Sequence, residues 1–240
     1  FRDLKITEGV YGLGSGIGAL VERCQVTGLT NQSGNTVGIY VDAHSVVQDC
    51  IVGDNLNNGA MCEGIRVEEG SVVRRCTAYR NAGLGSTGNG INAGTGALVS
   101  ECVANGNSYY GIRVSGGRAE RCTARNNSVG IYATAGGTVE GCTVENNSSA
   151  GIEATTGNRV LNSTVYNNGF QGINVSGDRN HVIGNGCNAN TSSGIFVYGD
   201  DNQVEDNRVI GNDFGIYLRW WAADDKAERN IVARNRAATN

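Results

Sequence analysis

Five polar side chains near the start of the chain are of the types that acid–base chemistry on a sugar uses. Asp42 and Glu68 supply carboxylates. His44 supplies an imidazole, Tyr40 a phenol and Arg66 a guanidinium. The first three kinds of group are the usual proton donors and acceptors of enzymes, and a guanidinium stabilises negative charge. The pair at 66 and 68 follows the pair at 40 and 42 by 26 residues, so a fold that repeats at this interval would bring them together.

The same interval separates several cysteines, and this identifies an internal repeat. One repeat position holds Cys24, Cys50, Cys76, Cys102, Cys122, Cys142, Ser163, Asn185, Asn207 and Asn230. A second position, after a glycine, holds Ile17, Ile39, Ile65, Ile91, Ile112, Ile131, Ile152, Ile173, Ile195 and Ile216. A third position holds Leu29, Asn55, Asn81, Asn107, Asn127, Asn147, Asn168, Asn190, Asn212 and Asn235. Periods of roughly 20 to 50 residues are typical of solenoids, arrays and propellers.

Short alternating runs inside each repeat predict strands. In residues 151–154 the apolar side chains lie two positions apart, which is the period of a strand, and in residues 139–144 the same inward alternation returns after a turn. Repeats of about 21 residues with three such strands must close into rungs that stack about 4.8 Å apart. Proline is absent, as expected where every amide bonds to the next rung, and the glycine before each isoleucine is expected to supply freedom of backbone angle. The pattern predicts an all-β fold, a single-domain parallel β-helix of about ten rungs over residues 1–240.

Composition argues against two classes of function. The net charge is −4 and the 19 basic residues are dispersed, which argues against nucleic acid as a partner. No apolar stretch reaches the roughly 18 residues of a membrane span.

Phe1, Leu4 and Ile6 already fit the second half of a preceding rung. We therefore expect the chain to be cut from a longer protein, with other domains adjoining the ends of the coil.

The eight cysteines could indicate disulfides, a metal site or buried thiols. Six stack in one inward column, where neighbouring side chains are too far apart and too parallel for ordinary disulfides. The pattern favours free thiols that act as small hydrophobic side chains. Cys187 falls in a column of core valines, whereas Cys62 is expected in a loop and accessible to labelling. No Cys-x-x-Cys or His–Cys cluster occurs, so no metal site is predicted.

The repeat resembles a known family. Residues 180–185 and 202–212, with Asn-x-Val-x-x-Asn spacing, resemble repeats of the pectate-lyase-like superfamily of right-handed parallel β-helices. The resemblance is closer to the carbohydrate-binding and sugar-hydrolase (NosD-like) repeats of bacterial surface and secreted proteins. It implies a right-handed coil, a polysaccharide ligand and an extracellular or cell-surface location. It carries over no catalytic residue.

Unequal rung lengths predict a groove. From the cysteine position to the next isoleucine the spacing is 15 residues in the first three rungs and 9 or 10 afterwards. The additional residues fall around 31–37, 57–63 and 82–89, and stacked insertions would form a wall beside the strand that follows them. The outward residues of that strand are Tyr40, Asp42, Arg66, Glu68 and Asn92, with His44 at its far end.

Catalysis in this groove has to be weighed against an ordinary solvated face. Asp42 and His44 loosely resemble the Tyr-x-x-Asp-x-His motif of mannuronan epimerases, but Tyr40 is one residue too close. A polyuronide lyase uses a lysine or arginine base and usually calcium, and the only lysines are Lys5 and Lys226. Asp42, His44, Arg66 and Glu68 remain the candidate catalytic residues, with calcium as a cofactor only if the protein is a lyase and otherwise none.

The same strand position continues along the coil with residues suited to sugars. It carries Arg113, Tyr132, Glu153, Asn174, Phe196, Tyr198 and Tyr217, followed by Trp220 and Trp221. Flat aromatic rings suit the apolar faces of sugars. The tryptophan pair could instead cover the open end of the coil. The first hypothesis is therefore a non-catalytic module that binds polysaccharide along this face; the alternatives are a polysaccharide lyase or uronate epimerase, and a purely structural or adhesive rod.

Overall fold

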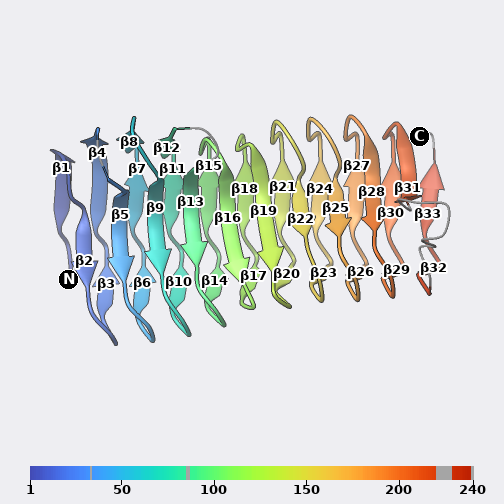
Figure 1. Ribbon diagram of the computed structural model, residues 1–240, viewed down its shortest axis with the longest axis horizontal. Coiled ribbons are helices and arrows are strands. Elements are labelled where there is room, and N and C mark those ends of the chain that lie inside the picture. Colours follow the sequence, from blue (N-terminus) through green and yellow to red (C-terminus); the bar gives the residue numbers. More distant parts are fainter. Residues whose placement is uncertain (33, 85–86, 220–228, 239–240) are drawn as a thin grey trace.

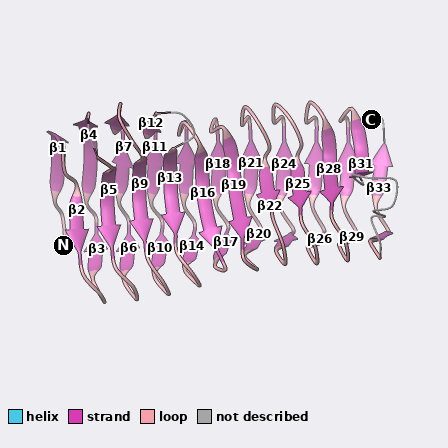
Figure 2. Cartoon of the chain, in the orientation of Figure 1, coloured by secondary structure: helices cyan, strands magenta, loops and turns pink. Residues whose placement is uncertain are grey.

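The computed structural model describes residues 1–32, 34–84, 87–219 and 229–238, which form a rod of stacked rungs (Figure 1). Within these residues every element is a strand, and Figure 2 shows these strands in magenta, joined by pink loops. All strand pairs are parallel, and each strand pairs with its counterpart one rung away. The strands form three long sheets, which confirms the predicted parallel β-helix of about ten rungs.

The three sheets are called I, II and III here. Sheet I comprises β3 (Leu20–Glu22), β6 (Val46–Gln48), β10 (Val72–Arg74), β14 (Leu98–Ser100), β17 (Arg118–Glu120), β20 (Thr138–Glu140), β23 (Arg159–Leu161), β26 (His181–Ile183), β29 (Gln203–Glu205) and β32 (Ile231–Ala233). Sheet II comprises β1 (Lys5–Gly9), β4 (Gln25–Asn31), β7 (Ile51–Gly53), β8 (Leu56–Asn57), β11 (Thr77–Tyr79), β12 (Ala82–Gly83), β15 (Val103–Asn105), β18 (Thr123–Arg125), β21 (Thr143–Glu145), β24 (Thr164–Tyr166), β27 (Gly186–Asn188), β30 (Arg208–Ile210) and β33 (Arg236–Ala238). Sheet III comprises β2 (Leu13–Ser15), β5 (Thr36–Val41), β9 (Cys62–Val67), β13 (Gly88–Ala93), β16 (Tyr110–Ser115), β19 (Val129–Thr134), β22 (Ile152–Ala154), β25 (Ile173–Ser176), β28 (Ser193–Tyr198) and β31 (Phe214–Arg219).

The core is a narrow column of like side chains. The isoleucines of sheet III from Ile39 to Ile195 are fully buried, and the valines of sheet I face them across the coil. Burying one such side chain stabilises the fold by about 1.5 to 3 kcal/mol. Because each rung repeats the same inward set, every rung buries its apolar face against the next.

Asparagine ladders complete the corners. In the predicted column the Nδ2 of Asn147 donates to the Oδ1 of Asn168 (2.9 Å), and the backbone N–H of Asn127 donates to the Oδ1 of Asn147 (3.0 Å). A further ladder, which the sequence analysis did not identify, runs through Asn158, Asn180, Asn202 and Asn230. These amides satisfy buried backbone donors that would otherwise be unpaired.

The glycine before each isoleucine is required by space, not by backbone angle. Gly64 has no positive φ, which corrects the expectation from the sequence. A Cβ on Gly64 would lie 2.6 Å from the Nδ2 of Asn81 and 2.6 Å from the carbonyl oxygen of Gly90. The ladder amide therefore occupies the volume that a side chain would need.

The register departs from the prediction at both ends. In the first rung Leu13, not Ile17, pairs with Ile39, and Ile17 is 76% exposed. In the last rung Asn235 continues the column of Asn207, whereas Asn230 joins the additional ladder. The sequence suggested otherwise because the terminal rungs have different lengths and the Gly-Ile and Asn signals occur there at more than one position.

The cysteine prediction is confirmed for the ladder and wrong for Cys62. All eight cysteines are free and buried. Cys62 begins β9 and is fully buried, with its thiol donating to the carbonyl oxygen of Asn55 (3.4 Å). Burial raises the pKa of Cys62 to about 12. The thiol is inside because the insertion before it folds back over β9.

Candidate functional site

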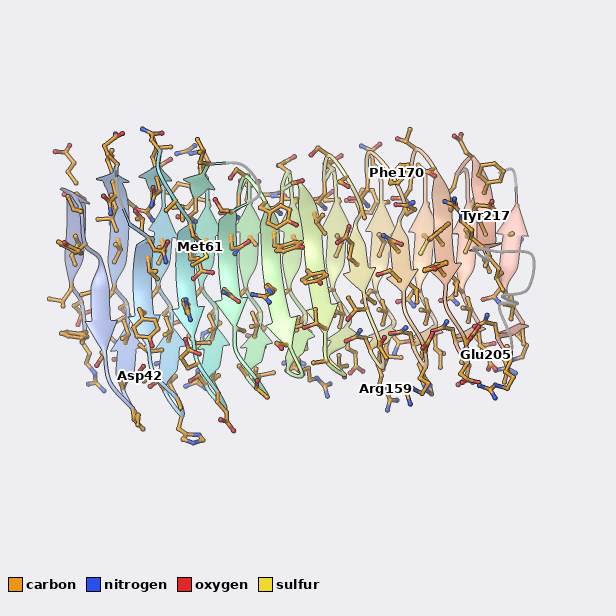
Figure 3. The ribbon with its side chains drawn as sticks, in the orientation of Figure 1. Asp42, Met61, Arg159, Phe170, Glu205 and Tyr217 are labelled. Atoms are coloured by element: carbon orange, nitrogen blue, oxygen red, sulfur yellow. The ribbon has the colours of Figure 1, made fainter. Side chains whose placement is uncertain are left out.

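The outward face of sheet III carries one continuous row of side chains. Strand pairing places Tyr40, Arg66, Asn92, Arg113, Tyr132, Glu153, Asn174, Phe196 and Tyr217 on adjacent strands in this order. At the usual strand spacing the row is about 38 Å long. Figure 3 labels Asp42, near its first member, and Tyr217, its last member, toward opposite ends of the rod. The row contains seven of the ten ligand-binding residues predicted from the sequence; Tyr198 pairs with Ser176 beside the row instead.

Four of the candidate residues in the first rungs are in contact. The hydroxyl of Tyr40 donates to the Oδ1 of Asp42 (2.6 Å), and this hydrogen bond raises the pKa of Tyr40. The Nε of Arg66 donates to the Oε1 of Glu68 (2.9 Å), and its guanidinium lies 5.7 Å from the centroid of the Tyr40 ring. Both carboxylates therefore already have partners on their own strand.

His44 lies apart from this group. It occupies an exposed corner beyond β5 with a left-handed backbone (φ 57°). Its backbone N–H donates to the carbonyl oxygen of Glu69 (2.9 Å), and its ring lies beside Gly70, where an added Cβ would be 2.8 Å from the Nδ1. The structure thus places the imidazole at a turn, away from the side chains of the row.

The three insertions stack as the sequence predicted. The end of β4 pairs with β8, and β8 pairs with β12, so together they form a short wall beside sheet III, at the upper edge in Figure 1. Asn57 organises the middle insertion. Its Nδ2 donates to the carbonyl oxygens of Gly34 (2.6 Å) and Met61 (3.0 Å), and its Oδ1 accepts the backbone N–H of Ala60 (2.8 Å).

The wall buries a carboxylate that sequence reasoning missed. Glu63 is fully buried, and its Oε1 accepts hydrogen bonds from the amides of Asn89 (3.2 Å) and Asn92. Its Oε2 has no hydrogen-bond partner and lies 3.8 Å from the Nη1 of Arg66. A signal was available: the residue two before the isoleucine is valine in the preceding rung and glutamate in this one. A buried carboxylate that contacts two members of the row connects the wall to the face.

A hollow of about 320 Å³ lies on the face over β9, β13 and β16. Its lining is Arg66, Val67, Glu68, Glu69, Asn92, Ala93, Gly94, Thr95, Arg113 and Ser115. It is therefore one rung farther along than the groove expected over the first three rungs. Tyr40 and Asp42 do not line it, because the phenol turns onto its neighbour and Arg66 covers the ring. Gly94 lies close to the preceding rung, because a Cβ there would be 3.1 Å from the Cα of Glu68.

The far end of the row is aromatic. The ring centroids of Phe196 and Tyr217 are 5.7 Å apart, and Phe214 stacks on Tyr217 at 5.5 Å. A second hollow of about 390 Å³ is lined by Asn174, Ser176, Phe196, Tyr198 and Arg219. Phe214 was not identified from the sequence. Trp220 and Trp221 lie outside the residues that the structure describes.

Two family models match the chain. Residues 8–168 match the family model described as right handed beta helix region. The chain belongs to this family. Residues 114–238 also match the model described as periplasmic copper-binding protein (NosD), which confirms the NosD-like resemblance and the pectate-lyase-like, right-handed fold. No curated protein matches the chain.

Solved structures with the same fold cover nearly the whole chain. The tailspike protein gp208 of Dettilon is similar with a TM-score of 0.65 and 15% identity; the match covers 99% of this chain and 61% of that one. The T265N mutant of the periplasmic alginate epimerase AlgG is similar with a TM-score of 0.63 and 14% identity, and the match covers 95% of this chain and 71% of that one. The A-module of the mannuronan C-5 epimerase AlgE4 from Azotobacter vinelandii is similar with a TM-score of 0.62 and 14% identity, and the match covers 98% of this chain and 81% of that one. At these identities the likeness establishes the fold alone.

Copper does not fit the donor groups of this right-handed β-helix. Among the described residues no three His, Cys, Asp or Glu side chains form a group that could hold a metal ion. His44 lies in the turn after β5, His181 begins β26 in sheet I, and the cysteines are enclosed in the core. No chemical step is therefore assigned to copper. The described part of the chain also contains no helix that could cross a membrane.

Proposed function

We propose that this right-handed β-helix binds a polysaccharide along the outward face of sheet III without cleaving it. The observation that carries the proposal is the row from Tyr40 to Tyr217, in which four aromatic and five polar side chains occupy equivalent positions on adjacent strands. Aromatic rings contact the apolar faces of sugars, and the polar side chains between them bond to hydroxyl groups. A face about 38 Å long accommodates several sugar units.

The known proteins support this proposal indirectly. Two of the similar structures are an alginate epimerase and a mannuronan C-5 epimerase, which are polysaccharide-modifying enzymes. The matching NosD model is described as periplasmic. The similarity to these epimerases and the match to the NosD model both agree with a protein that acts outside the cytoplasm, at the cell surface, in the periplasm or in the medium. The state of the candidate catalytic residues favours binding over turnover, because Asp42 and Glu68 are already paired and His44 lies at a separate corner.

The test is a glycan array followed by titration of the best ligands. We expect Phe196→Ala and Tyr217→Ala each to weaken binding about three- to tenfold, because each removes one ring from the row. Tyr166→Ala is the matched control, since Tyr166 lies on β24 in sheet II, away from the face. The proposal fails if no glycan binds, or if the Tyr166 variant loses as much affinity as the other two.

A second candidate function is a polysaccharide lyase or uronate epimerase. The hollow over β9, β13 and β16 favours it, because Arg66 and Arg113 lie two strands apart on either side of Asn92. Such an enzyme would show ultraviolet absorbance from unsaturated uronides or an epimerised product by NMR. Arg66→Ala should abolish that turnover. If neither turnover nor glycan binding is found, the third candidate, a structural or adhesive rod, is favoured.

A further inference from the structure

We propose that the middle of the row is a subsite for an amino sugar, in which Glu153 and Tyr132 receive a protonated amino group of the polysaccharide. This inference rests on the proposed function and names the class of ligand. It starts from a cluster on β16, β19 and β22 that lies beyond the insertion wall.

Two tyrosines outside the predicted set build the cluster. Tyr110 stacks on Tyr132 with the ring centroids 4.6 Å apart and the planes 4° from parallel. The hydroxyls of Tyr109 and Tyr110 are 2.8 Å apart and hydrogen bonded. Burial and this hydrogen bond raise the pKa of Tyr110, so the phenol stays neutral. One face of the Tyr132 ring is thus covered and its orientation is fixed.

Glu153 is the next side chain in the row after Tyr132. It is partly buried and makes no hydrogen bond or ion pair with the described residues. The strands paired with β22 place Tyr132 and the neutral amide of Asn174 beside it, and the phenol of Tyr110 is close enough to interact with the charge of Glu153. Burial raises the pKa of Glu153, because the charged form is partly desolvated. A ligand that supplies a charged donor would therefore be bound more strongly there than one that supplies only hydroxyls.

An ammonium group satisfies both neighbours at once. It forms a charge-assisted hydrogen bond with the carboxylate and a cation–π contact with an aromatic ring. Arg113, on the far side of Tyr132, lies two strands from Glu153, a backbone separation of about 10 Å at the usual strand spacing, and burial is the cause of the raised pKa of Glu153.

The charge of the whole outward face of sheet III also favours a ligand with a positive charge. Its described carboxylates are Asp42, Glu68, Glu69 and Glu153, and its guanidinium groups are Arg66, Arg113 and Arg219. The face is therefore acidic on balance, as is the chain, with a net charge of −4. At Glu153 a uronate carboxylate would be repelled, whereas a free amino group of a polysaccharide would be attracted.

The experiment compares oligosaccharides of one backbone and one length. Glucosamine oligomers and their N-acetylated counterparts are titrated into the full chain by calorimetry, in mildly acidic buffer where the amine is protonated. We expect the amine form to bind about tenfold more tightly, and we expect added salt to reduce this preference. In Glu153→Gln the preference should disappear, so that the ratio of the two affinities falls to about one. Glu140→Gln, on β20 of sheet I, removes the same charge from another surface and should preserve the preference.

Three outcomes overturn the inference. They are equal or tighter binding of the N-acetylated oligomer, a preference that survives in Glu153→Gln, and an equal loss in Glu140→Gln. Circular dichroism of both variants establishes that they are folded. Failure of the proposed function looks different, because then no oligosaccharide of any charge would bind and Phe196→Ala would have no effect. If uronate oligomers bind with loss in Phe196→Ala, the binding face is retained and the amino-sugar subsite is rejected.

Discussion

Replacing Asn147 by alanine should destabilise the β-helix through its hydrogen bonds, with little loss of apolar packing. Asn147 is 1% exposed. Its Oδ1 accepts the backbone N–H of Asn127 (3.0 Å), and its Nδ2 donates to the carbonyl oxygen of Ala124 (3.2 Å) and to the Oδ1 of Asn168 (2.9 Å). Alanine supplies none of these groups, so the N–H of Asn127 loses its acceptor inside the corner. A buried donor left unpaired costs about 1 to 3 kcal/mol.

The measurement is unfolding by urea and by heat. For a chain of this size each kcal/mol lowers the melting temperature by about 2 to 4 °C. Asn35→Ala is the control, because Asn35 is exposed in the first insertion, and we expect it to be close to neutral. Equal losses in the two variants would refute the reasoning, since they would mean that the amide of Asn147 satisfies no buried donor.

Three further predictions concern buried and partly buried groups. All eight cysteines, including Cys62, should resist thiol reagents until denaturant is added, and mass spectrometry that finds labelled Cys62 in the folded protein would contradict its burial. Glu63→Ala should lower the free energy of unfolding by about 1 to 3 kcal/mol, because two amides lose their acceptor, whereas Glu63→Gln should retain most of it; equal losses would exclude the hydrogen bonds as the cause. Glu153→Gln should raise the melting temperature at neutral pH, because a carboxyl whose pKa is raised by folding destabilises the native state once it is ionised. This gain should vanish as the pH falls below the pKa of the unfolded carboxyl, and a gain that is the same at all pH values would contradict the cited shift.

Much of the fold could be predicted because its signals repeat. The isoleucine column reappears as the fully buried row from Ile39 to Ile195, and the asparagine column as a chain of amide hydrogen bonds. Because the pattern recurs in about ten rungs, a residue that departs from it in one rung does not obscure the repeat. The same logic explains the errors at the ends, where Ile17 and Asn230 were misplaced because the terminal rungs have fewer neighbours with which to compare them.

The outward row was also predictable, because side chains alternate across a strand with a period of two. Once the inward isoleucine is known, the next residue faces outward. This gave the row from Tyr40 to Tyr217 without any knowledge of distances. The stacking of the three insertions followed from their equal lengths at one corner.

The sequence by itself therefore determined the coil, its columns and the face that points to solvent, because these depend on periodicity. Only the tertiary structure decided what the side chains outside the repeat do. It buried Glu63 and Cys62 beneath the wall, turned Tyr40 onto Asp42 and left His44 at a separate corner. Such outcomes depend on how individual rotamers and loops fill the space beside a neighbouring rung, and residues that occur once in the chain carry no periodic signal from which that packing can be read.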